Sequence, residues 1–250
     1  MSVWKDIHDR SNGKTVRKED DIHFTLVVDE TVVLEANELG CIKKSACLPF
    51  KLGGYKSIDE LLSTLGITVT IVPGIRKRTA PIQLWEAKVD LERKGDYKRA
   101  AMVEAQIRLW EDMSLRGLYD HAAKVIKLFP DEMRTEYNGK RMKELLVSTL
   151  AHEAMHAYFD RPGHDHLPDV VSVEEPMAEF GMLLYLHENQ GKEPINTDFY
   201  AWAEQDVLNQ KTCYRYGFAL MQQHLMEEKA INSGRTRTRI DFESYKESLF

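Results

Sequence analysis

Two histidines and a glutamate in one short stretch have the types and spacing of a metal-dependent hydrolytic site. The stretch reads His152-Glu153-Ala154-Met155-His156. On a helix, residues four apart lie one turn apart on the same face, so both imidazoles can reach one zinc ion at about 2.0–2.1 Å. Glu153, offset by one residue, can meet a water bound to that ion. The pattern therefore predicts a zinc-activated water with Glu153 as the general base.

A catalytic zinc ion usually has three protein ligands and one open position, so a third ligand must come from another segment. We favour Glu175, which follows His156 after eighteen intervening residues. Glu179 lies one helical turn beyond Glu175, and we expect it to accept a hydrogen bond from one ligand histidine. Two alternatives for the third ligand stay open: the adjacent Glu174, and His164 in the segment that follows the first helix.

Each of these residues also has an explanation that needs no metal. The His-Glu-x-x-His spacing arises by chance on the order of a few times per hundred sequences of this kind. Glu175 could close a capping box begun by Ser172. However, the helix that carries the motif is otherwise apolar, and burying an unpaired polar side chain costs roughly 1–3 kcal/mol. A bound metal removes that cost, so we prefer the metal site.

The sequence HEAMHAYF followed by EEPMAEF resembles the gluzincin clan of metallopeptidases. In that clan a His-Glu-x-x-His helix is followed by a helix that opens with Glu-x-x-Ala-Glu and an aromatic residue. The resemblance implies that His152, His156 and Glu175 bind zinc and that Glu153 is the general base. Glu179 takes the supporting position.

The resemblance covers roughly residues 116–190 and includes GLYDHAAKVIKLF, residues 117–129. This segment is similar to the strand that lies antiparallel to substrate in these enzymes, so we expect an extended peptide to pair beside residues 124–129. Gluzincins commonly stabilise the oxyanion with a Tyr or His from a later helix. Tyr214 and Tyr216 are the candidates here, with His224 less favoured.

Apolar periodicity predicts the helices that must position these side chains. Residues 140–159 have the length and apolar density of a mostly buried helix, which carries the motif. Three further helices are expected over residues 173–188, 197–210 and 211–229. Residues 117–129 are expected to form a strand that ends before Pro130.

The first part of the chain has weaker signals. Residues 22–36 are rich in β-branched residues around an Asp-Glu break, which predicts a strand pair. Ser57 and Glu60 form a capping-box pattern that opens a short helix, and Gly66 ends it. Residues 67–72 then predict a strand.

Residues 83–112 have helical spacing that is broken once, at Lys94-Gly95-Asp96, which predicts a helical hairpin. We expect it to pack against the main body, and the alternative is a partner-binding arm. The chain is therefore divided into an N-terminal α/β region (1–80), the hairpin (81–115) and a metallopeptidase domain (116–250).

Composition limits the partners and the compartment. The net charge of −6 gives no reason to expect nucleic acid, and no apolar stretch is long enough to predict a membrane span. Three cysteines at spacings that match no disulfide framework favour a reducing compartment, so we expect a cytoplasmic protein. The oligomeric state is not indicated.

These observations predict an α+β fold of the zincin type, with a small mixed or antiparallel sheet packed on the motif helix and a mostly helical C-terminal part. The expected function is zinc-dependent hydrolysis of a peptide or protein substrate. The alternative is a non-catalytic regulatory or partner-binding protein that zinc stabilises.

Overall fold

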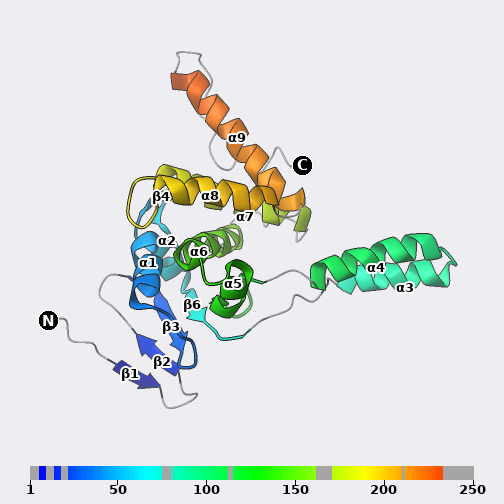
Figure 1. Ribbon diagram of the computed structural model, residues 1–250, viewed down its shortest axis with the longest axis horizontal. Coiled ribbons are helices and arrows are strands. Elements are labelled where there is room, and N and C mark those ends of the chain that lie inside the picture. The colour runs from blue at the N-terminus through cyan, green and yellow to red at the C-terminus, as the bar shows by residue number, and fades with distance from the viewer. Residues whose placement is uncertain are drawn as a thin grey trace.

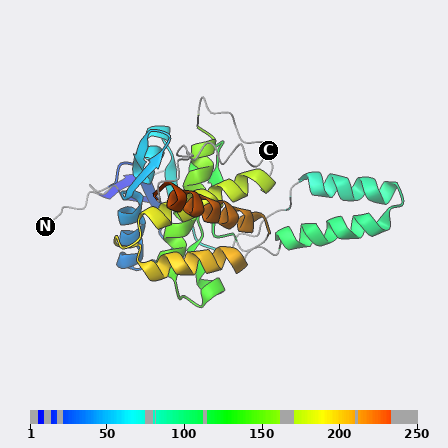
Figure 2. The same cartoon turned by 90° about the horizontal axis from the view of Figure 1, so that it is seen from above.

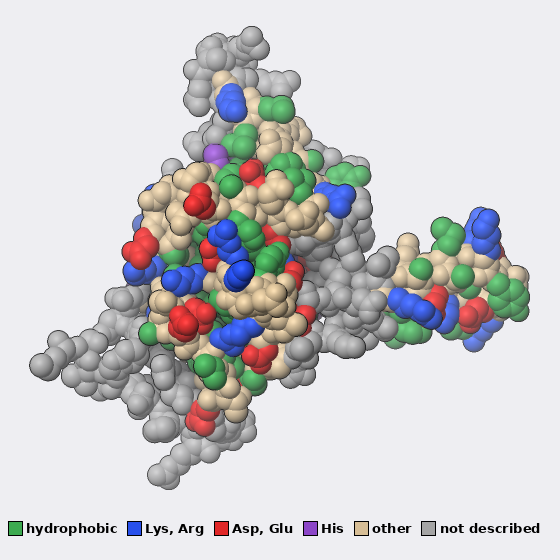
Figure 3. Space-filling model, in the orientation of Figure 1, with side chains coloured by type: hydrophobic (Ala, Val, Ile, Leu, Met, Phe, Trp, Pro, Cys, Tyr) green, Lys and Arg blue, Asp and Glu red, His purple; other side chains and the backbone are tan. Residues whose placement is uncertain are grey.

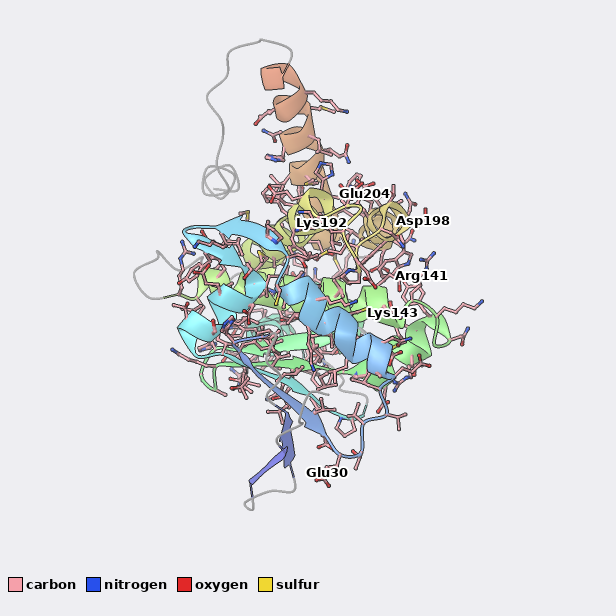
Figure 4. All side chains as sticks on the ribbon, turned by 90° about the vertical axis from the view of Figure 1, so that its left-hand side faces the viewer. Glu30, Arg141, Lys143, Lys192, Asp198 and Glu204 are labelled. Carbon is pink, nitrogen blue, oxygen red and sulfur yellow. The ribbon has the colours of Figure 1, made fainter. Side chains whose placement is uncertain are left out.

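The computed structural model describes residues 6–9, 14–17, 22–74, 80, 82–111, 115–161, 171–209 and 212–232. Helices, one mixed sheet and one smaller two-stranded sheet are the regular elements of this part of the chain, so the α+β class is confirmed (Figure 1). Strands β1 and β2 lie at the opposite end of the molecule from the last helix, α9 (Thr212–Asn232), in both Figure 1 and the side view of Figure 4.

The main sheet has six strands in the order β1 (Asp6–Asp9), β2 (Lys14–Arg17), β3 (Thr25–Asp29), β6 (Thr68–Ile71), β8 (Val125–Leu128) and β7 (Gly117–Asp120). The three central strands β3, β6 and β8 run parallel, and the remaining pairs are antiparallel. A separate two-stranded hairpin is formed by β4 (Pro49–Leu52) and β5 (Tyr55–Ser57). β7 therefore stands at one end of the strand order.

Helix α6 (Met142–Phe159) is the centre of the core, and 15 of its 18 residues are buried. It packs against β7, β8 and most of the other helices of the body. These are α1 (Ala36–Ala46), α2 (Ile58–Leu65), α5 (Pro130–Tyr137), α7 (Val171–Glu188) and α8 (Thr197–Asn209). The prediction of a mostly buried helix over residues 140–159 is confirmed, and so are the three helices that follow it.

The predicted N-cap and end of α2 are confirmed, but the capping box is not closed, because the Glu60 carboxylate accepts from the Lys56 amide and not from that of Ser57. The Ser57 hydroxyl oxygen accepts a hydrogen bond from the Glu60 backbone amide at 3.1 Å. Gly66 ends the helix in the left-handed conformation, with φ of 67°, which glycine adopts without steric cost. The predicted strand over residues 67–72 is β6.

The predicted strand pair over residues 22–36 is wrong in its second half. After β3, the Asp29 side chain accepts hydrogen bonds from the backbone and the hydroxyl of Thr31, which closes a turn. Glu35 and Glu38 then form a capping box that starts α1. The local side-chain hydrogen bonds thus start a helix where β-branched composition suggested a strand.

The segment 117–129 contains two strands where we expected one. Asp120 accepts a hydrogen bond from the Ala123 amide at 3.0 Å, and Lys124 has φ of 51°, so the chain reverses between β7 and β8. β8 lies between β6 and β7, and both of its edges are already paired. The expectation that a peptide pairs beside residues 124–129 is therefore wrong. On this side of the sheet, the strand with no neighbour among the described strands is β7.

The helical hairpin consists of α3 (Ile82–Arg93) and α4 (Tyr97–Glu111), as the sequence predicts. It does not pack against the body. Within the described residues, α3 and α4 make extensive contacts only with each other, and the hairpin projects away from the other elements in Figures 1 and 2. Tyr97 and Met102 of α4 are exposed, so the apolar residues of the hairpin do not all pack on the core as the sequence suggested.

The main sheet joins strands from the predicted regions 1–80 and 116–250. The boundaries between the predicted regions stay a prediction. A search of the described helices found none with the length and apolar character needed to cross a membrane.

Helices α7 and α9 approach each other closely at Gly217. A Cβ atom on Gly217 would lie 2.7 Å from the Glu179 Cβ, 2.8 Å from the Pro176 carbonyl oxygen and 2.9 Å from the Phe180 nitrogen. These distances are shorter than any normal van der Waals contact, so only glycine fits while α7 and α9 keep this spacing.

We predict that Gly217→Ala lowers the free energy of unfolding by about 1–3 kcal/mol, because the two helices must move apart. The control is Gly40→Ala in α1, where a Cβ would meet nothing within 4 Å. That variant should be neutral or gain up to about 1 kcal/mol from helix propensity. Urea unfolding of both variants measures the difference, and equal stabilities would contradict the close approach.

Candidate metal centre

Three side chains from α6 and α7 point their polar atoms at one place. His152 and His156 lie one turn apart on α6, and Glu175 is on α7. The His152 Nε2 atom is 3.1 Å from the His156 Nε2 atom. The Glu175 Oε2 atom is 3.2 Å from the first of these nitrogens and 3.8 Å from the second. Among the described residues, these three form the one group of His, Cys, Asp and Glu side chains close enough to share a metal ion.

These separations have the size that a tetrahedral zinc site requires. Ligand atoms about 2.1 Å from a central ion stand about 3.4 Å apart at the corners of a regular tetrahedron. The three measured separations of 3.1, 3.2 and 3.8 Å lie on both sides of that value. The donor set of two imidazole nitrogens and one carboxylate therefore fits a small divalent cation with only slight adjustment.

Each histidine is held from behind by a second carboxylate. The His152 Nδ1 atom lies 2.6 Å from the Glu179 Oε2 atom, and the His156 Nδ1 atom lies 2.9 Å from the Glu174 Oε1 atom. Glu179 is only 3% exposed. A carboxylate on one ring nitrogen places the proton there and leaves the other nitrogen with a lone pair for a metal. Both rings thus present Nε2 to the same point.

This arrangement also separates the roles of Glu174 and Glu175. The contact between Glu179 and a motif histidine is present as the sequence predicts. Glu174, an alternative third ligand, lies against the outer nitrogen of His156 and is not in the group that could share an ion. Sequence reasoning missed this contact because α7 presents two adjacent carboxylates and only the turn of the helix decides which one faces inward.

Glu153 lies between α6 and the edge strand β7, and it is buried. Its Oε2 atom accepts a hydrogen bond from the Tyr119 backbone amide at 2.8 Å. A Cβ on Gly117 would come within 2.9 Å of the Glu153 Oε1 atom and 2.5 Å of the Thr149 side chain. Glycine at position 117 therefore allows β7 to approach the helix closely enough for the Tyr119 amide to hold the Glu153 carboxylate.

Tyr119 is a site neighbour that the sequence did not reveal. Its hydroxyl donates a hydrogen bond to the Asp160 carboxylate at 2.9 Å, so both ends of the residue contact α6 or its C-terminal cap. The Gly-x-Tyr pattern at residues 117–119 was the available signal. The strand was expected to serve the substrate alone, and its contact with Glu153 depends on a tertiary approach that the pattern does not encode.

The remaining predicted residues are not brought to the site by the described geometry. Tyr216 on α9 is 58% exposed. The side chain of Tyr214 and all of His164 lie outside the described residues. The His224 ring packs edge-on against Phe180, with their centroids 6.1 Å apart. The residue that would stabilise an oxyanion therefore stays a prediction.

Burial and charge act in opposite directions on the three central groups. Burial lowers the pKa of His156, but the hydrogen bonds to Glu174 and Glu175 raise it by more. The resulting pKa is about 9. The pKa of His152 also rises well above its usual value, because Glu179 and Glu175 outweigh burial. Burial raises the pKa of Glu175, yet the two imidazoles bring it well below its usual range. Without a metal, protons supply the positive charge that this cluster needs.

Comparisons of the chain with protein-family models, with curated proteins and with solved structures found no match. The function therefore has to be inferred from the site itself.

The pKa shifts predict how the stability of the metal-free protein depends on pH. The pKa of His156 rises from 6.5 to about 9 on folding, so its contribution is complete below pH 6.5 and is lost as the pH rises through 9. The loss is about 3 kcal/mol, since one pKa unit corresponds to about 1.4 kcal/mol. Glu175 has a lowered pKa, so its contribution is lost only as the pH falls below 4.5.

Urea unfolding in the presence of a chelator, at a series of pH values from 6 to 9.5, measures this dependence. The His156→Gln variant is the control and should lose about half of the slope, because His152, whose pKa is also raised, still titrates over this range. An excess of zinc should also remove the slope in the wild type, because the metal takes the place of the protons. An identical slope in the wild type and His156→Gln would show that another group is responsible.

Proposed function

We propose that the chain is a zinc-dependent metallopeptidase of the gluzincin type, with a zincin-like fold around α6 and α7. One observation carries this proposal: the Nε2 atoms of His152 and His156 and the Oε2 atom of Glu175 converge with the separations of a tetrahedral site. Two imidazoles and one carboxylate are the ligand set of many catalytic zinc sites, and they leave the fourth position to solvent. A purely structural zinc site is usually closed by four protein ligands.

When bound, the zinc ion would lower the pKa of its water toward about 7 and polarise the scissile carbonyl group. Glu153 supports hydrolysis because it directly follows His152 in the sequence and the Tyr119 amide holds its carboxylate in place. A fixed carboxylate can accept a proton from the attacking water and return it to the leaving amine. Glu179 and Glu174 keep both imidazoles in the tautomer that offers Nε2.

A peptide substrate is supported by the outer edge of β7 beside the site, which pairs with no other strand in the part of the chain that the structure describes. The Tyr119 amide points away from β8, toward Glu153, and Gly117, two residues earlier, turns its backbone groups to the same side. An extended peptide can therefore pair with the Gly117 amide and with the carbonyl groups of Gly117 and Tyr119. Pairing through the main chain selects for a peptide without selecting for its sequence.

The oxyanion donor is assigned to α9. Gly217 brings this helix against α7 beside Glu179. Tyr214 stands three residues before Gly217 in the sequence, within one helical turn. We therefore favour Tyr214 over the exposed Tyr216 as the group that stabilises the developing negative charge.

The proposed compartment is the reducing cytoplasm. Cys41 is a free thiol in the structure. Free thiols are typical of proteins that work under reducing conditions.

A second candidate function is a non-catalytic module in which zinc only stabilises the fold and partner binding is the activity. The projecting hairpin α3–α4 favours this reading, because an arm separate from the core suits an interaction role. The two functions share the metal site and differ in whether Glu153 acts on substrate.

The test combines metal content with hydrolysis of an unstructured peptide library by the zinc-loaded protein. We predict that Glu153→Gln keeps one zinc ion per chain but loses activity by about 100-fold or more, the usual contribution of a general base. The control is Glu144→Gln in the first turn of the same helix, which should keep both properties. His152→Ala should lose the zinc ion.

A wild type that binds zinc but cleaves no peptide, or a Glu153→Gln variant with full activity, would contradict a metallopeptidase. The first of these results would favour the non-catalytic module.

A further inference from the structure

The hairpin of α3 and α4, residues 82–111, is called the arm from here on. Two isolated helices of 12 and 15 residues are at the length where helices in water are marginally stable. None of the α3 residues is buried. The contact between its helices is formed around Ala100 and Ile107 of α4 and an ion pair between Lys88 and Glu104. The arm thus gains little stability from its own packing.

Apolar side chains are nevertheless exposed on the arm. On α3, Ile82 (67% exposed), Trp85 (36%) and Val89 (41%) are spaced by three and four residues, so they share one face. On α4, Tyr97 is 71% exposed and is followed at four-residue spacing by the exposed Ala101 and Ala105. Figure 3 shows hydrophobic side chains among the charged ones on the exposed surface of the arm.

Helical geometry places the two apolar rows on the same side of the arm. Around the axis of α3, the apolar row lies about a third of a turn from the side that faces α4. Around the axis of α4, the apolar row lies at a similar angle from Ala100 and Ile107, which face α3. Because the helices are antiparallel, both rotations lead to the same side. Small alanines beside Trp85 and Val89 leave room for a partner's large side chains.

The charges of the arm are divided along its length. The tip, residues 91–99, has four basic and two acidic side chains. The base, residues 82–90 with 100–111, has two basic and four acidic side chains. The arm is therefore neutral overall, whereas the whole chain carries a net charge of −6.

We propose that the arm is a dimerisation element that packs antiparallel against the arm of a second copy of this chain. In that arrangement the basic tip of each arm lies beside the acidic base of the other, and the apolar rows face each other. A parallel arrangement would put tip against tip and base against base, with like charges together. The antiparallel arrangement also keeps the two negatively charged bodies at opposite ends of the paired arms. The result is a four-helix bundle with two-fold symmetry.

A second copy fits this surface better than another class of partner. A membrane surface attracts a basic patch, but the arm is neutral and the acidic Glu86 and Asp90 directly follow Trp85 and Val89 in the sequence. A charge pattern that complements itself when reversed end to end is what a two-fold interface requires, because each patch meets the other twice. This proposal does not depend on the metal site.

Sedimentation equilibrium of the full-length protein tests the proposal directly. The wild type should form a dimer at micromolar concentration, and Trp85→Glu should weaken dimerisation by about 30-fold or more, as expected for a central aromatic contact. The control is Val33→Glu, which changes an apolar residue that is 76% exposed outside the arm and should leave the dimer unchanged. Circular dichroism should show that all three proteins remain folded.

Charge reversal provides a second test that does not rely on loss of function. Lys98→Glu with Arg99→Glu reverses the tip, and Glu86→Lys with Asp90→Lys reverses the base. Each double variant alone should be monomeric, because both of its contacts become repulsive. An equimolar mixture of the two should form heterodimers, because both contacts become attractive again.

A monomeric wild type, or a dimer that Trp85→Glu and both charge variants leave intact, would overturn the proposal. A monomer would assign the apolar rows of the arm to a different protein or to a lipid surface.

Discussion

The structure depends on the charge balance at the contact between α6 and α7. Two imidazoles from α6 meet three carboxylates from α7 in the interior, and none of these groups can be buried there without a partner. Protons on the histidines satisfy the carboxylates in the metal-free protein, and a divalent cation satisfies the same groups when it replaces those protons. The apolar residues of α6 and α7 bring the helices together, and the polar cluster fixes their register. The same contact that holds the core in register is therefore the contact that brings the proposed metal ligands together.

The catalytic proposal requires a third element, β7, to be held at a fixed distance from α6. Arg116, just before the strand, donates hydrogen bonds to Glu136 of α5 and Asp206 of α8. Burial lowers the pKa of Arg116, but the two carboxylates raise it more, so the guanidinium stays charged and paired. Gly117 then lets the strand pass close to α6, and Tyr119 holds Glu153. The strand proposed to pair with substrate is thus also the strand that orients the proposed base.

The sequence predicted the helices that carry the site, because periodicity and caps act locally. The helix over residues 140–159 and the inward-facing Glu175 follow from the 3.6-residue repeat. Contacts between segments were not predictable in this way, and Glu174 and Tyr119 acquire their partners only when α7 and β7 pack on α6. The turn after Asp120 and the start of α1 were missed because single side-chain hydrogen bonds outweighed β-branched composition. The arm was expected to pack on the body because its apolar residues recur at helical spacing. A row of apolar residues has this spacing whether it is buried or exposed, so the sequence could not distinguish the two.

X-ray absorption spectroscopy at the zinc edge, on protein loaded with one equivalent of zinc, tests the central claim most directly. We predict a four-coordinate site with two imidazole nitrogens at about 2.0–2.1 Å and two oxygens, one from a carboxylate and one from solvent. Glu175→Ala should change this spectrum, whereas Glu174→Ala should leave it nearly unchanged. A site that lacks histidine scattering, or one that is altered by Glu174→Ala and not by Glu175→Ala, would contradict the proposed ligand set.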